Sequence, residues 1–534
     1  MRRRLRARIG FVLLVAAYVA SVFWVFTRSE PVIHAREVTI YFAHWQIERG
    51  PPDGIAAAIK RYEELNPRVH VVQLEIPGAT IYPQWMRSNL VGNTGPDLME
   101  WGAWLPGQKD IPARYFAPLT AELAKPNPYN KGTSQEKIAW LDTFHDKLLA
   151  PKRDSPDPGQ IYGVNITEVT LRLFCNVELM KQIMGKVIVP KDFNDLRKIL
   201  AAVKEFSRKT GQPISGLAGS RDTTRAVAET VFAAPLIGVN QRLDDAGTLY
   251  LYNRQMLAAY LAGRWNYREP AVLAGLQLVR ESTNSMKPGF IQLRRDDAMI
   301  EFLRGQALFF FYGTWDATSL RRLAPFKIQP MKLMQAMPDD PEVGKYVVGQ
   351  GGEGIGETAL SMYLNKDSRH PAEALDFLKF LTSVPGNQLF TDASLWLPAV
   401  NGVEVPEEIR NFRDYQEGLS FGQAPYDAIG TEVSMNWDRN FYLLAGDQGS
   451  AEQFAAAMDR AMPDAVLQDL KWELRATLVL VKPQDPAIVG WAGLPGEKAK
   501  TRREESEASQ TMSEGLALQM KLQIEAAENA RRDR

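Results

Sequence analysis

Downstream of about residue 36, the chain alternates short stretches of strand periodicity with longer stretches of helical periodicity. Residues 37–42 and 69–76 alternate apolar with polar side chains, whereas residues 54–65 repeat apolar side chains at helical spacing and end at Asn66 and Pro67. This β-α-β opening predicts a mostly parallel sheet covered by helices. In such sheets, ligands bind in a crevice outside the carboxyl ends of the strands.

Later segments continue this alternation. Helices are predicted over residues 193–209, 270–283, 372–381 and 451–462, and strands over residues 307–312 and 359–364. The final segment, residues 496–534, is nearly all polar. We expect it to be a tail or a lone helix outside the core.

The amino end has the pattern of a membrane anchor. Five arginines within Met1–Arg8 precede the apolar run Ile9–Phe26, which would span roughly 27 Å as a helix. The positive-inside rule keeps the arginines in the cytoplasm, so we expect a single-pass protein of the cell membrane with its body on the periplasmic or extracellular side. A cleaved signal peptide is the alternative, with Ile33–Ala35 as a weak cleavage site.

The composition excludes several classes of protein. Of 534 residues, 45% are hydrophobic and 24% are charged, which argues against a disordered chain and against a multi-span membrane protein. Lys plus Arg and Asp plus Glu number 63 each, so the chain has no net charge to attract nucleic acid. Nucleic acid is therefore not an expected partner.

Metal and cofactor chemistry has little support. The single cysteine, Cys175, excludes an intramolecular disulfide and a multi-thiolate metal site, and none of the five histidines is paired at metal-ligand spacing. Gly349–Gly354 matches a dinucleotide fingerprint, but residues 355–364 predict a strand where the fingerprint needs a helix N-terminus. We interpret it as a glycine-rich crossing strand and expect no cofactor, no metal and no catalytic residue.

Tryptophan is the residue type that points to a ligand. The chain has 12 tryptophans, several of them near predicted strand ends or loops, and a flat ring with a polar rim stacks well on the C–H face of a sugar. For each ring, packing in the core is the alternative. Their grouping with Glu100, Glu168 and Arg221 favours a site for a polyol, because carboxylates accept hydrogen bonds from neighbouring hydroxyls.

Five local patterns, in the right order along the chain, resemble one family. They resemble motifs of the family 1 extracellular solute-binding proteins of ABC importers, the maltose-binding-protein-like group. The matching stretches are residues 38–69, Gly95–Trp101, Leu173–Leu179 with Val177 where the family has Lys, residues 302–315 with Gly313-Thr314-Trp315, and residues 372–399 ending in Leu397-Pro398-Ala399.

The resemblance implies an α/β protein of two lobes joined by crossing strands, which close on a ligand between them through a hinge. It divides the chain into six parts. Residues 1–36 form the anchor and linker, 37–165 and 351–398 form lobe 1, 166–350 and 399–495 form lobe 2 with the C-terminal helices, and 496–534 form the polar tail.

The resemblance also implies positions that bind the ligand. Trp101 stands at the stacking position after Pro-Asp, and Trp315 at the tryptophan of the "G-x-W" motif. Trp437 lies near the family's late aromatic residue, and Glu168 lies one position from a ligand-binding acid. Trp45 follows the first strand, where the maltose-binding relative has polar residues.

The expected function is capture of a carbohydrate, most simply an oligosaccharide, and its delivery to ABC permease subunits in the membrane. In the same fold, a binder of a polyamine or glycerol phosphate is the alternative, with Arg221 or Glu353 as the discriminating charge. Two further alternatives are a ligand-sensing adaptor and an exported glycosidase, which needs two carboxylates about 5 to 9 Å apart.

Overall fold

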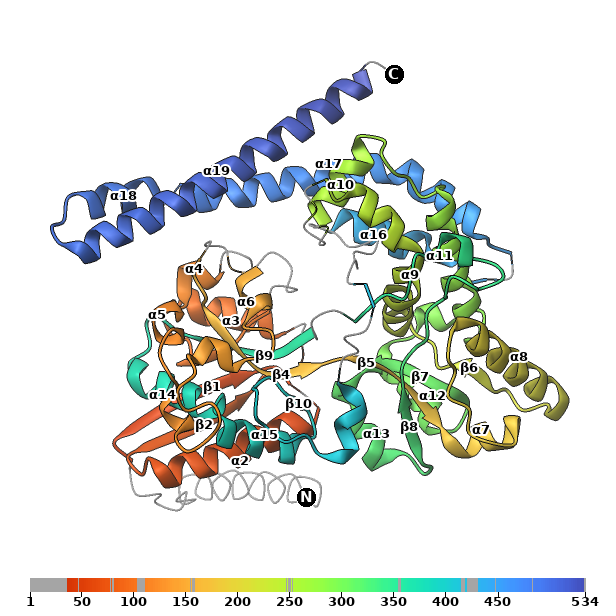
Figure 1. Cartoon of the computed structure of the whole chain (residues 1–534), viewed down its shortest axis with the longest axis horizontal. Coiled ribbons are helices and arrows are strands. Elements are labelled where there is room, and N and C mark those ends of the chain that lie inside the picture. Colours follow the sequence, from red (N-terminus) through yellow and green to blue (C-terminus); the bar gives the residue numbers. More distant parts are fainter. Residues whose placement is uncertain are drawn as a thin grey trace, which may run out of the picture.

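The computed structural model shows two α/β lobes side by side, with a long helical arm above them (Figure 1). It describes residues 36–46, 48–76, 78, 81–102, 111–153, 155, 159–245, 247, 251, 253–353, 357–413, 418–419, 431–446, 448–482 and 484–532. The predicted membrane anchor, Ile9–Phe26, lies outside these residues. Within the described part, none of the helices combines the length and the apolar composition needed to cross a membrane.

Lobe 1 is built on a six-stranded sheet in the order β10-β4-β9-β3-β1-β2. Its strands are β1 (Val38–His44), β2 (Val69–Glu75), β3 (Leu98–Glu100), β4 (Gly163–Val169), β9 (Glu357–Leu364) and β10 (Leu397–Pro398). Only β1 pairs in parallel, with β2 and β3, while β9 and β10 run antiparallel to their neighbours. The prediction of a mostly parallel sheet is therefore wrong, because β9, which returns from lobe 2, and β10, which follows α15, both pair antiparallel with β4.

Helices cover the lobe 1 sheet and bury its apolar side chains. The main ones are α2 (Gly50–Leu65), α3 (Tyr82–Val91), α14 (Pro371–Leu381) and α15 (Val384–Ser394), with shorter turns α4 (Ile111–Tyr115), α5 (Thr120–Leu123) and α6 (Leu149–Arg153). Helices α2 and α15 approach closely at Gly54, where an added Cβ would lie 2.9 Å from the Phe390 carbonyl oxygen. Glycine is required here because a side chain would push the two helices apart.

Lobe 2 has a four-stranded sheet in the order β6-β7-β5-β8, in which only β6 and β7 are parallel. The strands are β5 (Leu171–Asn176), β6 (Ser215–Leu217), β7 (Ala307–Gly313) and β8 (Ile328–Met331). The helices are α7 (Val177–Met184), α8 (Phe193–Thr210), α9 (Arg221–Leu243), α10 (Asn253–Leu261), α11 (Pro270–Thr283), α12 (Arg295–Leu303) and α13 (Ala317–Leu323).

One residue separates the two sheets where the chain first crosses between them. Strand β4 of lobe 1 ends at Val169 and strand β5 of lobe 2 begins at Leu171, which leaves Thr170 at the crossing. The Thr314 N–H donates to the Thr170 carbonyl oxygen at 2.8 Å, and the Thr170 N–H donates to Thr314 Oγ1 at 3.1 Å. These two bonds tie the end of β7 to the crossing.

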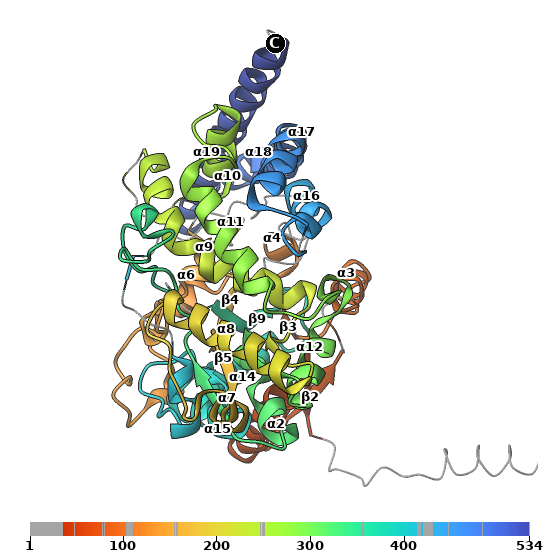
Figure 2. The same ribbon diagram turned by 90° about the vertical axis from the view of Figure 1, so that its right-hand side faces the viewer.

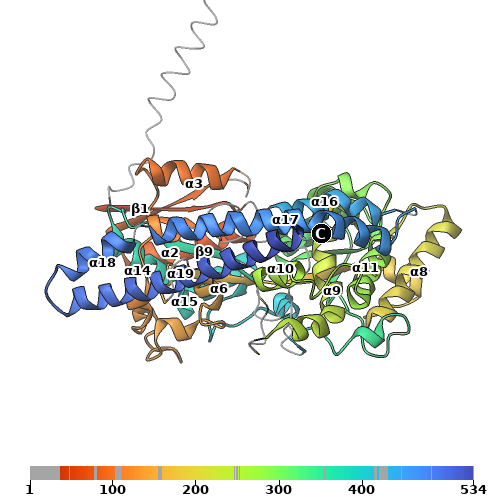
Figure 3. The same cartoon turned by 90° about the horizontal axis from the view of Figure 1, so that it is seen from above.

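The C-terminal helices form the arm. They are α16 (Glu432–Asn440), α17 (Ala451–Val481), α18 (Gln484–Ala492) and α19 (Glu497–Arg532). Seen from the side, the arm stands above the lobes, and seen from above, α17 and α19 run side by side from lobe 2 across lobe 1 (Figures 2 and 3). Helices α10 and α11 of lobe 2, and the arm helix α16, pack against α17.

Two predictions for this region need correction. The helix expected over residues 451–462 continues to Val481, through Pro463. A proline leaves the carbonyl four residues earlier without its helical donor, and here that carbonyl, on Asp459, accepts the Tyr260 hydroxyl at 3.4 Å. The segment expected to be a tail or a lone helix outside the core is a helix packed along α17, with Ile524 and Ala527 buried in the lobe 2 core.

We predict that Gly54→Ala lowers the unfolding temperature of lobe 1, by an amount equivalent to about 1 to 3 kcal/mol, because the new methyl group overpacks the α2–α15 contact. Gly490→Ala in α18 is the matched control, since an added Cβ there meets open space. Calorimetric unfolding of both variants checks the prediction. Equal stability of the two variants would show that α2 and α15 do not pack this closely.

Candidate functional site

The ends of several elements from both lobes converge at the hinge. We define the inter-lobe site by the side chains found there: His44, Trp45, Gln46, Glu48, Glu100 and Trp101 from lobe 1, and Asp222, Arg295, Tyr312, Trp315 and Asp316 from lobe 2. The lobe 1 members follow the carboxyl ends of β1 and β3. The β-α-β pattern of the sequence predicts a ligand crevice at this edge of the sheet.

An ion pair joins the two halves of the site. Arg295, at the first turn of α12, places Nη1 3.0 Å from Glu48 Oε1 of lobe 1 and 3.6 Å from Asp316 Oδ1. Its backbone N–H donates to Asp222 Oδ2 at 3.0 Å. The guanidinium therefore has three carboxylate partners, Glu48, Asp316 and Asp296, the last with Oδ1 3.1 Å from Nε, while Asp222 bonds the backbone of Arg295.

Asp316 is the most unusual of these acids. Its side chain is almost completely buried, and Oδ2 makes no hydrogen bond to any described residue. Burial raises the pKa of Asp316 to about 7, against the opposing attraction of Arg295. A buried carboxylate oxygen without a donor is a group that a ligand hydroxyl or ammonium can satisfy.

On the lobe 1 side, burial disfavours the charged forms of Glu100 and His44. Glu100 is fully buried, accepts from Gln46 Nε2 at 2.6 Å and from the Trp45 N–H at 3.2 Å, and has a pKa raised well above its usual value, chiefly by burial. Burial also lowers the pKa of His44 to about 4. The His44 ring accepts the Gln46 N–H at Nδ1, and its Nε2 lies 2.9 Å from the Gln73 amide nitrogen. These bonds fix the loop that carries Trp45.

Two half-buried tryptophans belong to the site, one from each lobe. Trp45 stands edge-on to Tyr82 with ring centroids 5.2 Å apart, and Trp315 stands edge-on to Tyr312 at 5.3 Å. Although Trp315 follows β7 of lobe 2, its ring packs against the core of lobe 1. A Cβ at Gly313 would lie 2.2 Å from that ring, which explains physically why glycine precedes this tryptophan by two residues.

Trp101 is placed at the site but turned into the core. Only 1% of its surface is exposed, its ring stands edge-on to Tyr363 at 5.2 Å, and its Nε1 has no hydrogen-bond partner among the described residues. Its neighbour Glu100 connects it to the Trp45 loop. In this arrangement Trp101 supports the site from beneath, and its ring face is not available for stacking.

The two expected acids at the crossings are occupied by protein partners. Glu353 receives two hydrogen bonds from the fully buried Arg172 guanidinium, at 2.9 and 3.1 Å. Glu168 lies 3.2 Å from His145 Nδ1 and is 7% exposed. Both acids thereby stabilise the crossing strands.

The remaining two expected residues lie apart from the site as defined. Arg221 is exposed at the first position of α9, one residue before Asp222. Trp437 is 2% exposed in α16 and packs against Phe454 at 4.9 Å and Phe232 at 6.2 Å, within the core of lobe 2. Its ring face is not available to a ligand in this conformation.

Sequence reasoning missed Arg295, Glu48 and Asp316. Asp316 directly follows the Gly313-Thr314-Trp315 motif, and Arg295 lies in a run of four charged residues at the start of a helix. A charged residue next to a ligand-binding motif was a usable signal. The pairing of Glu48 with Arg295 could not be predicted from the sequence, because 246 residues lie between them and only the fold brings them together.

Two other kinds of site, a metal site and a reactive thiol, can be compared with the described residues. Within them, no group of three or more His, Cys, Asp and Glu side chains is arranged to hold a metal ion. Cys175 is buried, and burial raises the pKa of its thiol to about 12. A thiol held in this state is a poor nucleophile.

The family model of bacterial extracellular solute-binding proteins matches residues 57–412 of the chain. No curated protein matches the sequence. Three solved structures share the fold. A chitin oligosaccharide binding protein is 17% identical, with a TM-score of 0.55 over 80% of this chain and 99% of its own. The GacH receptor of Streptomyces glaucescens is 18% identical, with a TM-score of 0.55 over 80% of this chain and 98% of its own.

The third structure comes from work on xylan utilisation by Caldanaerobius polysaccharolyticus. It is 19% identical, with a TM-score of 0.54 over 79% of this chain and 99% of its own. All three relatives are thus covered almost completely, while about a fifth of this chain lies outside each match. At these identities the likeness establishes the fold.

We predict that acid destabilises the chain through His44. Its pKa is about 6.5 in the unfolded chain and about 4 in the fold, so the unfolded state binds more protons between these values. The resulting penalty is absent above pH 6.5 and grows to at most about 3 kcal/mol as the pH falls towards 4. In His44→Gln, the free energy of unfolding should depend less steeply on pH across this window.

Urea unfolding from pH 4 to 7 measures this slope. His370→Gln, at the start of α14 and outside the site, is the control and should keep the wild-type slope. An unchanged slope in His44→Gln would contradict the burial of a neutral His44.

Proposed function

The chain belongs to the bacterial extracellular solute-binding proteins, and from this premise we propose that it captures an oligosaccharide in the inter-lobe site and delivers it to an ABC permease. The observation that carries the proposal is the placement of Trp315. This half-buried ring extends from lobe 2 to the core of lobe 1, next to the ion pair that joins the lobes.

The side chains of the site suit a sugar. Trp45 and Trp315 offer flat apolar faces, on which the C–H face of a pyranose stacks. Around them, the partly exposed Glu48 and Asp222 are acceptors for sugar hydroxyls, Asp316 is a buried acceptor, and the Gln46 amide adds a donor and an acceptor. Binding between two lobes also removes both ligand faces from water.

The similar solved structures support a carbohydrate as the ligand class. One is described as a chitin oligosaccharide binding protein, and another as a receptor in complex with acarbose and an acarbose homologue. Because their identity to this chain is below one fifth, they support the class of solute and leave its particular sugar open to experiment.

We further propose that Ile9–Phe26 anchors the body on the outer side of the cell membrane, beside its permease partner. The support is the arginine-rich flank before a run long enough to span the bilayer. Cell fractionation followed by amino-terminal sequencing tests this. A mature chain starting near Arg36 would instead show a cleaved signal peptide.

A positively charged solute is the second candidate, favoured by the excess of carboxylates in the site. Three carboxylates, Glu48, Asp222 and Asp316, contact Arg295. An ammonium group would satisfy the free Asp316 oxygen as well as a sugar hydroxyl does. The same excess disfavours glycerol phosphate, whose charge the acids repel.

The test is a thermal unfolding screen of the full chain with xylotriose, triacetylchitotriose, maltotriose, raffinose and spermidine. A ligand at 100 times its dissociation constant stabilises the fold by about 2.7 kcal/mol. We expect one trisaccharide to raise the unfolding temperature, and Trp315→Ala to weaken its binding at least about tenfold through the loss of stacking area.

Trp491→Ala is the matched control, because this half-buried tryptophan lies in α18 of the arm. It should bind the sugar as the wild type does. Recovery of the sugar intact after incubation would agree with capture without hydrolysis. A shift with spermidine alone would contradict the carbohydrate proposal and select the second candidate.

A further inference from the structure

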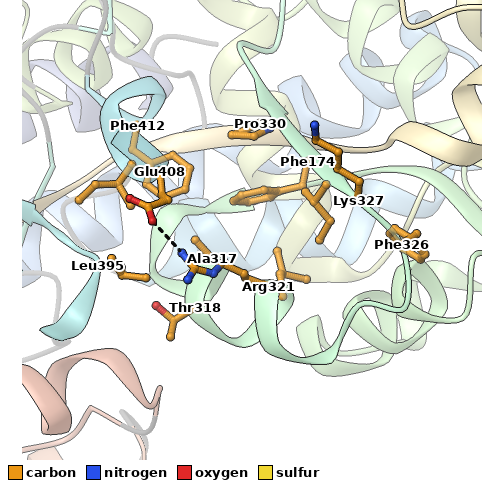
Figure 4. Close-up of a pocket in the computed structure, with 13 residues that line it drawn as sticks. Phe174, Ala317, Thr318, Arg321, Phe326, Lys327, Pro330, Leu395, Glu408 and Phe412 are labelled. Carbon is orange, nitrogen blue, oxygen red and sulfur yellow. Dashed lines mark ion pairs between the residues drawn. The ribbon is translucent and has the colours of Figure 1, made fainter. Parts of the chain in front are cut away.

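A cavity lies beside strand β5, on the sheet face opposite the main core of lobe 2 (Figure 4). Its volume is about 270 Å³, and it shares no residue with the inter-lobe site. Side chains of β5 alternate between the two faces, so Phe174 lines this cavity while Leu173 and Cys175 point into the main core. We call it the hinge pocket.

The walls of the hinge pocket come from both lobes. Lobe 2 contributes Phe174, Pro330 of β8 and the helix α13, and the chain returning from lobe 1 contributes Leu395 and the turn η6 (Glu407–Phe412). Hydrogen bonds hold this return chain in place: the Thr318 hydroxyl donates to the Ser394 carbonyl oxygen at 3.0 Å. The pocket is therefore a formed feature of the structure, with fixed walls.

The interior of the pocket is apolar and aromatic, while its rim is charged. Figure 4 shows the Phe174 ring in the middle of the pocket with Phe412 and Pro330 beside it. Three charged side chains line it, Arg321, Lys327 and Glu408. Arg321 Nη1 lies 3.8 Å from Glu408 Oε1, and no ion pair of Lys327 is found within the described part of the chain.

The one ion pair on this rim is weak. Its two side chains are 59% and 57% exposed, and pairs in such surroundings contribute between zero and about 1 kcal/mol. A ligand carboxylate can displace Glu408 from Arg321 at little cost. The rim then presents the Arg321 guanidinium to the bound anion, while Lys327 lies on the other side of the Phe174 ring (Figure 4).

We propose that the hinge pocket binds a small monocarboxylate with an aromatic body. The ring of the ligand lies among Phe174, Phe412 and Pro330, and its carboxylate pairs with Arg321. The volume limits the ligand, because drug-sized molecules occupy pockets of about 300 to 1,000 Å³. A single ring with a short acid side chain fits this limit.

Calorimetric titration of the full chain with 3-phenylpropionate tests the proposal, with the neutral 3-phenylpropanamide as the matched ligand. We expect saturable binding of the acid and at least about tenfold weaker binding of the amide, because a charged hydrogen bond is lost. Arg321→Gln should weaken the acid by a similar factor. Glu408→Gln should strengthen it by up to about fivefold, since the competing carboxylate is gone.

Arg304→Gln is the control variant, an exposed arginine of lobe 2 outside the pocket. It should bind the acid as the wild type does. Three results would each overturn the proposal: no saturable binding of the acid up to about 10 mM, equal binding of acid and amide, or equal binding by Arg321→Gln and Arg304→Gln. The charged residues involved are exposed, so these variants retain the fold.

Discussion

The structure depends on how the chain is held at Thr170, the single residue between the two sheets. All of its polar groups are engaged: its N–H and its carbonyl bond Thr314, and its hydroxyl donates to the Phe412 carbonyl. Because Thr170 is buried, any of these groups left without a partner would be costly. The end of strand β7 and the chain returning from lobe 1 are therefore both hydrogen-bonded to Thr170, and the two lobes are joined there.

Two arginines that pair with carboxylates lie near this crossing. The crossing strands carry the buried Arg172 with Glu353, and the site above them carries Arg295 with Glu48 and Asp316. A buried charge is tolerated only when it is paired and hydrogen-bonded. The two pairs differ in where their partners lie: Arg172 is matched by two parallel bonds, whereas Arg295 divides its interactions among acids from both lobes. The second arrangement leaves acceptor capacity for a solute.

Much of the fold could be predicted from local sequence. Helix α11 has the predicted bounds, and β7 and α14 each differ from the predicted bounds by one residue, because their apolar periodicity and capping residues act over short distances. The antiparallel returns of β9 and β10 could not be predicted, since strand order depends on contacts between residues far apart. The continuation of α17 through Pro463 likewise required a partner, Tyr260, from another helix.

The residues of the candidate site could be predicted only in part, because their exposure also depends on contacts between distant residues. Motif positions identify Trp315 and Trp45 as residues near the hinge, but burial decides which rings are accessible. Trp101 and Trp437 are also tryptophans, yet each is packed against aromatic neighbours. Residue type predicts what a side chain can do, and only packing determines whether it is exposed to do it.

The helical arm is attached to one lobe and extends past the other. Helix α17 packs on α10 and α11, so the arm is attached to lobe 2. Helix α18 lies at the other end of the arm, on the side of lobe 1 (Figure 3). A helix as long as α19, with 36 residues, extends for about 54 Å. Any rotation of lobe 2 about Thr170 would therefore displace α18 further than it displaces residues near the hinge, because displacement grows with distance from the rotation axis.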